Sequence, residues 1–249
     1  REIFMDVLRG FAILGIFIAN LKSFTWYEAS NENIGSMFLP ILDKQIAFLH
    51  LMFIEGKFYS IFSLLFGWGI ALQFKRADDK GINALPTVRR RLFFMLLLGA
   101  CHLLIWPGDI VFFYALLGFI LLPFRKLSDK ALLITGTILI LSPILLYALK
   151  SQWQWLNAPS GILFDIGGRL DKILLDTTLS SDESIADFLK HASWWEVLKG
   201  DISGFFYRYG YLFFVSRISK VLGVFLIGYA LGRSDFYKNI SKHKNTLYA

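Results

Sequence analysis

Charged residues are scarce in this chain of 249 residues, since only 18% are Asp, Glu, Lys or Arg, whereas an ordinary soluble domain carries about a quarter. Cysteine is scarcer still: Cys101 is the only one, which excludes an intrachain disulfide. The four histidines and the cysteine have no zinc-site spacing. No phosphate-binding loop, dinucleotide-binding glycine pattern or internal repeat is present. These absences argue against a bound metal or nucleotide cofactor recognised by a short motif.

Apolar residues dominate instead. The chain is 55% hydrophobic, contains 25 phenylalanines and has a mean hydropathy of +0.53. A helix that crosses a membrane needs about 20 mostly apolar residues. The sequence therefore predicts an all-α fold, a polytopic membrane bundle, with spans at residues 4–21, 57–74, 92–106, 110–124, 131–149 and within 205–232. Asp6 interrupts the basic end of the first span and no cleavage site follows, so we expect this span to be retained rather than removed as a signal peptide.

The order of these segments divides the chain into three regions. Residues 1–149 form a predicted five-helix transmembrane core, residues 150–204 an extracytoplasmic segment, and residues 205–249 a sixth transmembrane helix with a basic tail. Within the middle region, four apolar residues recur at helical spacing: Ile162, Ile166, Leu170 and Leu174. This spacing predicts an amphipathic helix that lies on the membrane or caps the bundle.

Basic residues indicate the orientation. The net charge of +7 is concentrated at residues 75–91, 125–130 and 233–244, and a six-span arrangement puts all three stretches on one side. Loops rich in Lys and Arg stay in the cytoplasm. We therefore predict a plasma-membrane protein whose N-terminus and C-terminus are both cytoplasmic. The partner that the positive charge implies is the lipid bilayer and not nucleic acid.

Several polar residues interrupt the apolar segments. Asp6 and Arg9 lie three positions apart, which places them on one helical face as an ion pair. Charges inside a membrane span are candidates for function, but an acid near a helix start and an arginine at the headgroups explain this pair equally well. Lys57 reads as an interfacial anchor at the mouth of the second span. Tyr114 is a further polar side chain inside the fourth span.

His102 and Asp109 form the most informative pair. They flank Pro107 and Gly108 in the run "GACHLLIWPGDIVFF", where the chain turns back between the third and fourth spans. Taken separately, the histidine reads as a link between helices and the aspartate as a helix N-cap. Taken together, the carboxylate can accept from one imidazole nitrogen and leave the other to act as a base.

Four strings resemble the YeiB-like family of poorly characterised bacterial membrane proteins: "DVLRGFAILGIFIANL", "GKFYSIFSLLFGWGIAL", "RRRLFFMLLLGACHLLIWPGDIVFFYALLGFILLPFRK" and "VLGVFLIGYALGR". That family is distantly similar to transmembrane acyltransferases, including the heparan glucosaminide acetyltransferase group. Its members continue with further membrane helices after the "LGR" segment, so we expect this chain to be partial.

The resemblance implies transfer of an acyl group from cytoplasmic acyl-CoA, as a co-substrate, to an extracytoplasmic glycan or lipid acceptor. Arg9, Arg89, Arg90 and Arg91 would then bind the donor, while His102 would deprotonate the acceptor with Asp109 fixing its tautomer. In the related acetyltransferases the catalytic histidine comes from the outer loop after the first helix, which is nearer His50. His102 is preferred because His50 has no acidic residue close in sequence.

Two other functions fit the same residues. In a transporter or channel component, Asp6, Arg9, His102 and Asp109 would line a polar path; inverted repeats would favour this class, and none is seen. In a membrane scaffold, the same residues would only join helices. The sequence favours no particular oligomeric state.

Overall fold

The computed structural model describes residues 3–24, 40–177, 179 and 182–234. Within these residues every regular element is a helix, which confirms the predicted all-α fold. The sequence predicts that residues 26–44, between the first two spans, lie on the extracytoplasmic side. Most of these residues and the basic tail after Ser234 lie outside the described residues. The chain forms two compact units, which are described separately below.

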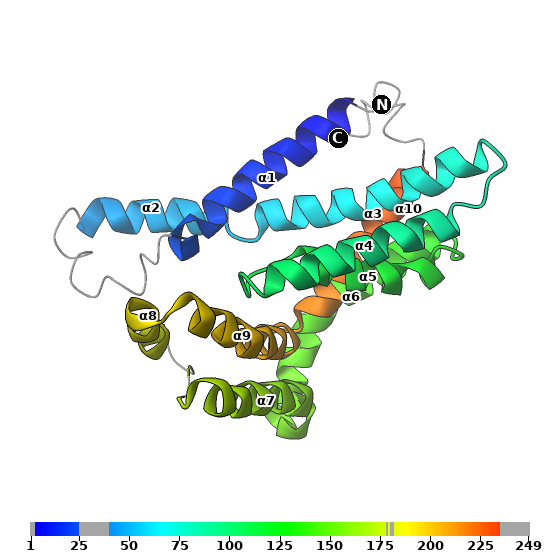
Figure 1. Ribbon diagram of the computed structural model, residues 1–249. Coiled ribbons are helices and arrows are strands. Elements are labelled where there is room, and N and C mark those ends of the chain that lie inside the picture. The colour runs from blue at the N-terminus through cyan, green and yellow to red at the C-terminus, as the bar shows by residue number, and fades with distance from the viewer. Residues whose placement is uncertain (1–2, 25–39, 178, 180–181, 235–249) are drawn as a thin grey trace. The chain divides into compact units, whose positions relative to one another are not determined.

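Unit 1 contains Arg1–Phe62, Leu103–Gly108 and Asn157–Tyr211. Its helices are α1 (Ile3–Phe24), α2 (Pro40–Phe53), the first turns of α3 (Lys57–Asp78), α7 (Ala158–Leu175), α8 (Asp182–His191) and most of α9 (Trp194–Phe214) (Figure 1). Gly56 separates α2 from α3 with a φ of 76°, a conformation that glycine adopts without steric cost. Lys57 donates to the carbonyl of Leu51 over 2.7 Å, so its ammonium group caps the end of α2.

The predicted amphipathic helix is α7. It packs on α9, since the ring of Tyr207 lies against Gly167. Of the four apolar residues, Ile166, Leu170 and Leu174 are half-buried and Ile162 is exposed, while Asp171 is fully buried. Asp171 accepts from the hydroxyl of Tyr207 over 2.8 Å and from the backbone N–H of Leu179 over 2.9 Å. Both hydrogen bonds go to Oδ2 and offset the cost of burying that oxygen, whereas Oδ1 is buried without a hydrogen-bond partner among the described residues.

Unit 2 contains Ser63–His102, Asp109–Leu156 and Leu212–Ala249. It is built from the rest of α3, then α4 (Leu85–Leu103), α5 (Val111–Phe124), α6 (Asp129–Gln152), a short 3-10 turn (Gln154–Asn157) and α10 (Arg217–Arg233). Helix α10 packs on α6 and α5. Glycine makes this packing close: a Cβ on Gly223 would overlap the carbonyl of Gly136. Small residues let apolar helices approach in this way.

The centre of unit 2 is aromatic. The rings of Phe66, Tyr114 and Phe225 contact one another with centroids 4.7 to 5.3 Å apart. The Tyr114 hydroxyl hydrogen-bonds the hydroxyl of Ser63 over 2.5 Å, so its buried polar end is satisfied.

Several helices are compatible with a membrane. Among the described residues, three segments are long and apolar enough to cross one: Ile3–Leu21, Lys44–Asp78 and Asp129–Gln152. The predicted fourth span, at residues 110–124, corresponds to α5, which has only 14 residues. This is about 21 Å of helix, whereas the hydrocarbon core is about 30 Å thick. The structure therefore supports several spans, and the number six stays a prediction.

The predicted sixth span is not one helix. Helices α9 and α10 meet at an angle of 72°, and the break lies at Ser216, whose φ of 53° interrupts the helical backbone. Lys150 stabilises the break by donating to the carbonyls of Phe213 and Phe214 over 2.8 and 2.9 Å. If this bent pair forms one span, the candidate spans number up to four.

Candidate active site

His102 and Asp109 lie in contact within unit 2, at the end of α4 and just before α5. Asp109 Oδ2 is 2.6 Å from His102 Nδ1, and Asp109 Oδ1 accepts from the backbone N–H of Phe112 over 2.6 Å. One carboxylate thus does both things that its sequence position predicted. It caps the first turn of α5 with one oxygen and holds the imidazole with the other.

Burial differs sharply between the two side chains. The Asp109 side chain is 0% exposed and that of His102 is 48% exposed. A buried carboxylate needs hydrogen bonds on its oxygens, and each oxygen of Asp109 has one. An ionised carboxylate only accepts, so the hydrogen bond between an ionised Asp109 and a neutral His102 requires the proton on Nδ1 and leaves the imidazole lone pair on Nε2. This is the tautomer that a general base requires.

Arg89, Arg90 and Arg91 are exposed and lie in the first turns of α4. His102 follows Arg91 by eleven residues, about 16 Å along the helix. The structure therefore does not bring this basic cluster to His102. In unit 1, Arg9 forms the predicted ion pair with Asp6, with 3.3 Å between Nη1 and Oδ1.

His50, the alternative histidine, lies near the end of α2 in unit 1. Its Nε2 is buried and has no hydrogen-bond partner among the described residues. Among the described residues, no carboxylate forms a hydrogen bond or ion pair with its ring. The geometry of a base oriented by an acid is thus found at His102.

A charged cavity in unit 2 was not identified from the sequence. It has a volume of about 520 Å³ and lies where α3, α5 and α10 end and α6 begins. Its charged lining residues are Lys75, Asp78, Asp79, Arg125, Lys126, Asp129 and Arg233. The seven come from three stretches far apart in sequence, so no local motif marks them. The shared sign of the three basic stretches is the only signal that could have found it.

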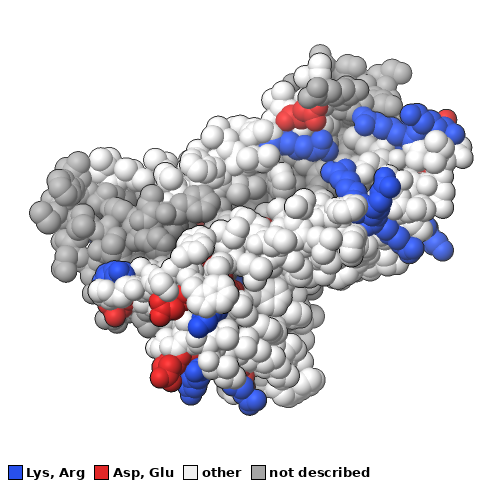
Figure 2. Space-filling model, viewed as in Figure 1, with Lys and Arg blue, Asp and Glu red and all other residues white. Residues whose placement is uncertain are grey.

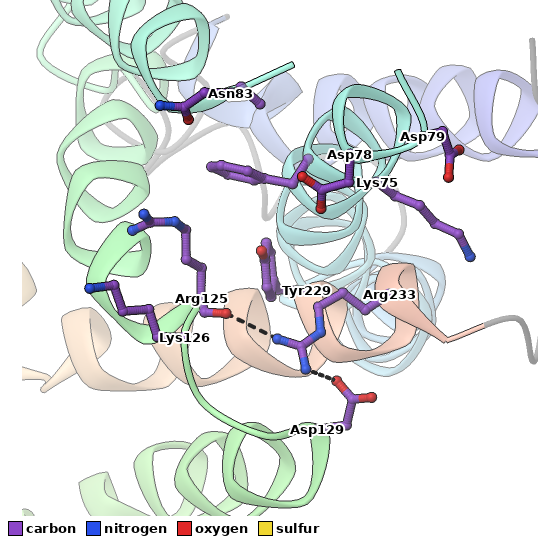
Figure 3. A pocket seen from close by; sticks show the side chains of 11 residues that line it. Lys75, Asp78, Asp79, Asn83, Arg125, Lys126, Asp129, Tyr229 and Arg233 are labelled. Carbon is purple, nitrogen blue, oxygen red and sulfur yellow. Dashed lines mark hydrogen bonds and ion pairs between the residues drawn. The ribbon is translucent and has the colours of Figure 1, made fainter. Parts of the chain in front are cut away.

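Arg233 fixes one side of this cavity. Its guanidinium donates to the carbonyls of Arg125 and Leu127 over 3.0 and 2.9 Å and pairs with Asp129 over 2.6 Å (Figure 3). The charge of Arg233 is therefore neutralised within the protein. The same end of unit 2 carries the exposed Arg76 near the end of α3 and the exposed Lys80 in the α3–α4 connection, and Figure 2 shows Lys and Arg gathered there.

Among the described residues, no group of three His, Cys, Asp or Glu side chains is arranged to hold a metal ion. The contact between Asp109 Oδ2 and His102 Nδ1 suits proton transfer by an imidazole that a carboxylate orients.

Comparison with known proteins finds homologues without an assigned function. The chain is 41% identical over 144 residues to the uncharacterized protein YxaH of Bacillus subtilis, covering 52% of this chain and 34% of YxaH. It is 33% identical over 180 residues to the uncharacterized protein YeiB of Escherichia coli, covering 66% of this chain and 44% of YeiB. An uncharacterized 39.9 kDa protein of Bacillus acidopullulyticus is 35% identical over 138 residues, covering 55% of this chain and 38% of that protein.

The chain thus spans less than half the length of these curated relatives. No family model and no solved structure matches it.

Proposed function

Because this chain is a homologue of the YeiB-like proteins, and because His102 and Asp109 form an oriented acid–base pair, we propose that it is a membrane acyltransferase. The donor is a cytoplasmic acyl-CoA, and the acceptor is a hydroxyl or amine on an extracytoplasmic glycan or lipid. The single observation that carries the proposal is the 2.6 Å contact between Asp109 Oδ2 and His102 Nδ1.

One base, His102, is enough for both proton transfers of the reaction. His102 Nε2 removes the proton from the acceptor hydroxyl or amine as its oxygen or nitrogen attacks the thioester carbonyl. The carbon–sulfur bond then breaks, and the thiolate leaves with the proton that the imidazole has held. Asp109 stays ionised throughout and stabilises the imidazolium that forms between the two steps. The products are the acylated acceptor and the thiol of the donor.

The donor's phosphates have a candidate site on the first turns of α4. Arg89, Arg90 and Arg91 are exposed there, and fork-shaped guanidinium groups pair well with phosphate oxygens. The donor would then extend over about 16 Å of α4 to place its thioester at His102. Neutralising the three arginines should weaken donor binding, and the loss should shrink at high salt because their exposed charges are screened.

Transport is the second candidate function, and the bend between α9 and α10 is the observation that favours it. Broken helices in transporters expose backbone groups that bind ions near the middle of the membrane. In this chain, Lys150 already occupies the carbonyls at the break. Acyl transfer is therefore preferred.

The test uses membranes that contain the full-length protein and acetyl-CoA labelled in the acetyl group as the probe. The wild type should move label into the lipid or glycan fraction, and His102→Ala should reduce this transfer to background. His50→Ala is the matched control and should retain transfer. Wild-type membranes that bind no acetyl-CoA and move no label, or a fully active His102→Ala protein, would overturn the proposal.

A further inference from the structure

The charged cavity of unit 2 has a basic side and a side on which acids outnumber bases. Figure 3 shows Arg125 and Lys126 on one side of Tyr229, and Asp78 and Asp79 together with Lys75 on the other. Arg233 and Asp129 neutralise each other at the cavity's edge. The charges that face a ligand are therefore basic at the end of α5, while the two carboxylates at the end of α3 outnumber the single lysine beside them.

The basic wall can accept a phosphate. The Arg125 guanidinium lies 5.7 Å from the ring centre of Phe74 and donates Nη1 to the carbonyl of Leu122 over 3.1 Å. Since a guanidinium has five N–H donors, most of them are left for a ligand. The neighbouring Lys126 is exposed, and no interaction of its ammonium group with another described residue is present.

The acidic wall argues against an ordinary anion site. Asp78 and Asp79 are both exposed at the end of α3, and like charges facing a phosphate would repel it. A ligand that carries an ammonium group next to its phosphate removes this repulsion, because the ammonium donates to carboxylates while the phosphate accepts from Arg125 and Lys126. This arrangement of basic and acidic side chains therefore favours a zwitterionic ligand that carries both a phosphate and an ammonium group.

The position of the cavity indicates where such a ligand is found. Two candidate spans have an end at it, because Lys44–Asp78 finishes there and Asp129–Gln152 begins there, and the bent pair finishes there at Arg233. If these segments cross a membrane, the cavity lies at headgroup depth. Its volume of about 520 Å³ is within the range of about 300 to 1,000 Å³ for small-molecule sites.

We propose that this cavity binds phosphoethanolamine, either as the headgroup of phosphatidylethanolamine or as the free compound. Arg125 and Lys126 hold the phosphate, and Asp78 and Asp79 hold the primary ammonium. The site does not depend on His102, and Asp109 lies at the other end of α5, about 21 Å of helix away. Loss of acyl transfer would leave this proposal intact.

The test compares lipids that share a phosphate and differ beside it. Full-length protein is reconstituted into phosphatidylcholine vesicles that also contain phosphatidylethanolamine or phosphatidylglycerol, and the lipid retained after purification is measured by mass spectrometry. The wild type should retain phosphatidylethanolamine about tenfold over its bulk share, as expected for one or two charge-assisted hydrogen bonds. Phosphatidylcholine keeps the phosphate and the positive charge but has no N–H, and phosphatidylglycerol has no ammonium group.

The variants separate the two walls. Asp78→Asn with Asp79→Asn should abolish the preference for phosphatidylethanolamine over phosphatidylcholine, whereas Lys126→Gln should lower retention of every phospholipid. Lys126 is exposed and its ammonium group has no hydrogen bond or ion pair with another described residue, so this variant stays informative if an Arg125 variant fails to fold. Lys172→Gln, at an exposed cation on α7 outside the cavity and outside the proposed donor site, is the matched control and should retain lipid as the wild type does.

Soluble phosphoethanolamine identifies the source. If it displaces the retained lipid, the free compound also fits, and if it does not, the lipid headgroup is the ligand. Equal retention of all three lipids by the wild type would overturn the proposal. A preference for phosphatidylglycerol would do the same, because a plain basic patch predicts that result.

Discussion

At the scale of single residues, Asp109 performs two tasks that its sequence position left as alternatives. Oδ1 caps α5 and Oδ2 holds His102. Both were predictable, because an acid after Pro-Gly is a good N-cap and because a short turn returns the chain toward His102. Only the structure shows that the two oxygens of one carboxylate divide these tasks between them.

The two tasks can be separated by substitution. Asn caps helices as well as Asp does, so Asp109→Asn should leave thermal stability nearly unchanged. Its amide N–H₂ would face Nδ1 of His102 and favour the wrong tautomer, so acyl transfer should fall severely. Asp109→Ala should lose activity and also about 1 kcal/mol of stability. Thermal melts in detergent beside the labelled-acetyl assay check this; an Asp109→Asn protein with full transfer would remove Asp109 from the proposed mechanism.

The charged cavity shows what residue patterns do not reveal. The Arg233 guanidinium donates a hydrogen bond to the backbone carbonyl of Arg125, which lies 108 positions earlier in the sequence. No sequence motif near either residue predicts this contact. The sequence predicted only that the basic stretches share one side. Which of their side chains line a cavity, and which remain exposed as Arg89 to Arg91 do, depends on how the helix ends are packed.

At the scale of helices, apolar runs located most elements within a few residues but misplaced some ends. The predicted segment 57–74 lies inside α3, which continues through its charged last turn to Asp78, and the segment 92–106 begins after the true start of α4 at Leu85. Charged residues end an apolar run without ending a helix. The break at Ser216 was not predicted, because a serine with positive φ has no local sequence signal.

Lys150 should be essential to that break. It donates to two backbone carbonyls and, over 3.2 Å, to the hydroxyl of Ser216. Lys150→Met removes the donor and should cost about 2 kcal/mol, as for hydrogen bonds to a charged group. Lys130→Met, at the exposed start of the same helix, is the control and should cost little. Unfolding followed by thermal melts in detergent distinguishes them, and equal stability of both variants would mean that the break holds without Lys150.

Glycine positions offer a second test of helix packing. A Cβ at Gly223 would overlap the Gly136 carbonyl and the Ile140 backbone nitrogen, while a Cβ at Gly10 meets nothing within 4 Å. Gly223→Ala should therefore destabilise unit 2 by about 1 to 3 kcal/mol through overpacking. Gly10→Ala should be neutral or stabilise α1 by up to about 1 kcal/mol. The melting temperatures of the two variants should move in opposite directions, and a tolerated Gly223→Ala would show that α6 and α10 are not in close contact.

At the scale of the whole molecule, composition predicted the fold class because it depends on the sum of many residues. Several helices of both units are apolar and exposed along much of their length, as α1 is at Phe4, Phe11 and Phe17. Soluble proteins rarely expose such large apolar surfaces to water, which supports a lipid environment for these helices. The number of crossings follows less directly, because α5 is short and α9 and α10 are bent.

Orientation is the prediction on which every assigned side depends, and α6 tests it most directly. Its 24 residues span about 36 Å, more than the hydrocarbon core of about 30 Å. Exposed residues lie at both ends, Lys130 at the start and Trp155 just after the end. Because Cys101 is the only cysteine, Cys101→Ala gives a background in which one introduced thiol can be labelled alone.

In that background, Lys130→Cys and Lys80→Cys should react with a membrane-impermeant maleimide only after the cells are opened, because the positive-inside rule places both in the cytoplasm. Trp155→Cys should react in intact cells. The Cys101→Ala protein without an introduced cysteine is the control for background labelling. Reaction of Lys130→Cys and Trp155→Cys from the same side would mean that α6 does not cross the membrane. Exchange of their sides would invert the orientation, and the donor proposed for the Arg89 to Arg91 end of α4 would then have to come from outside the cell.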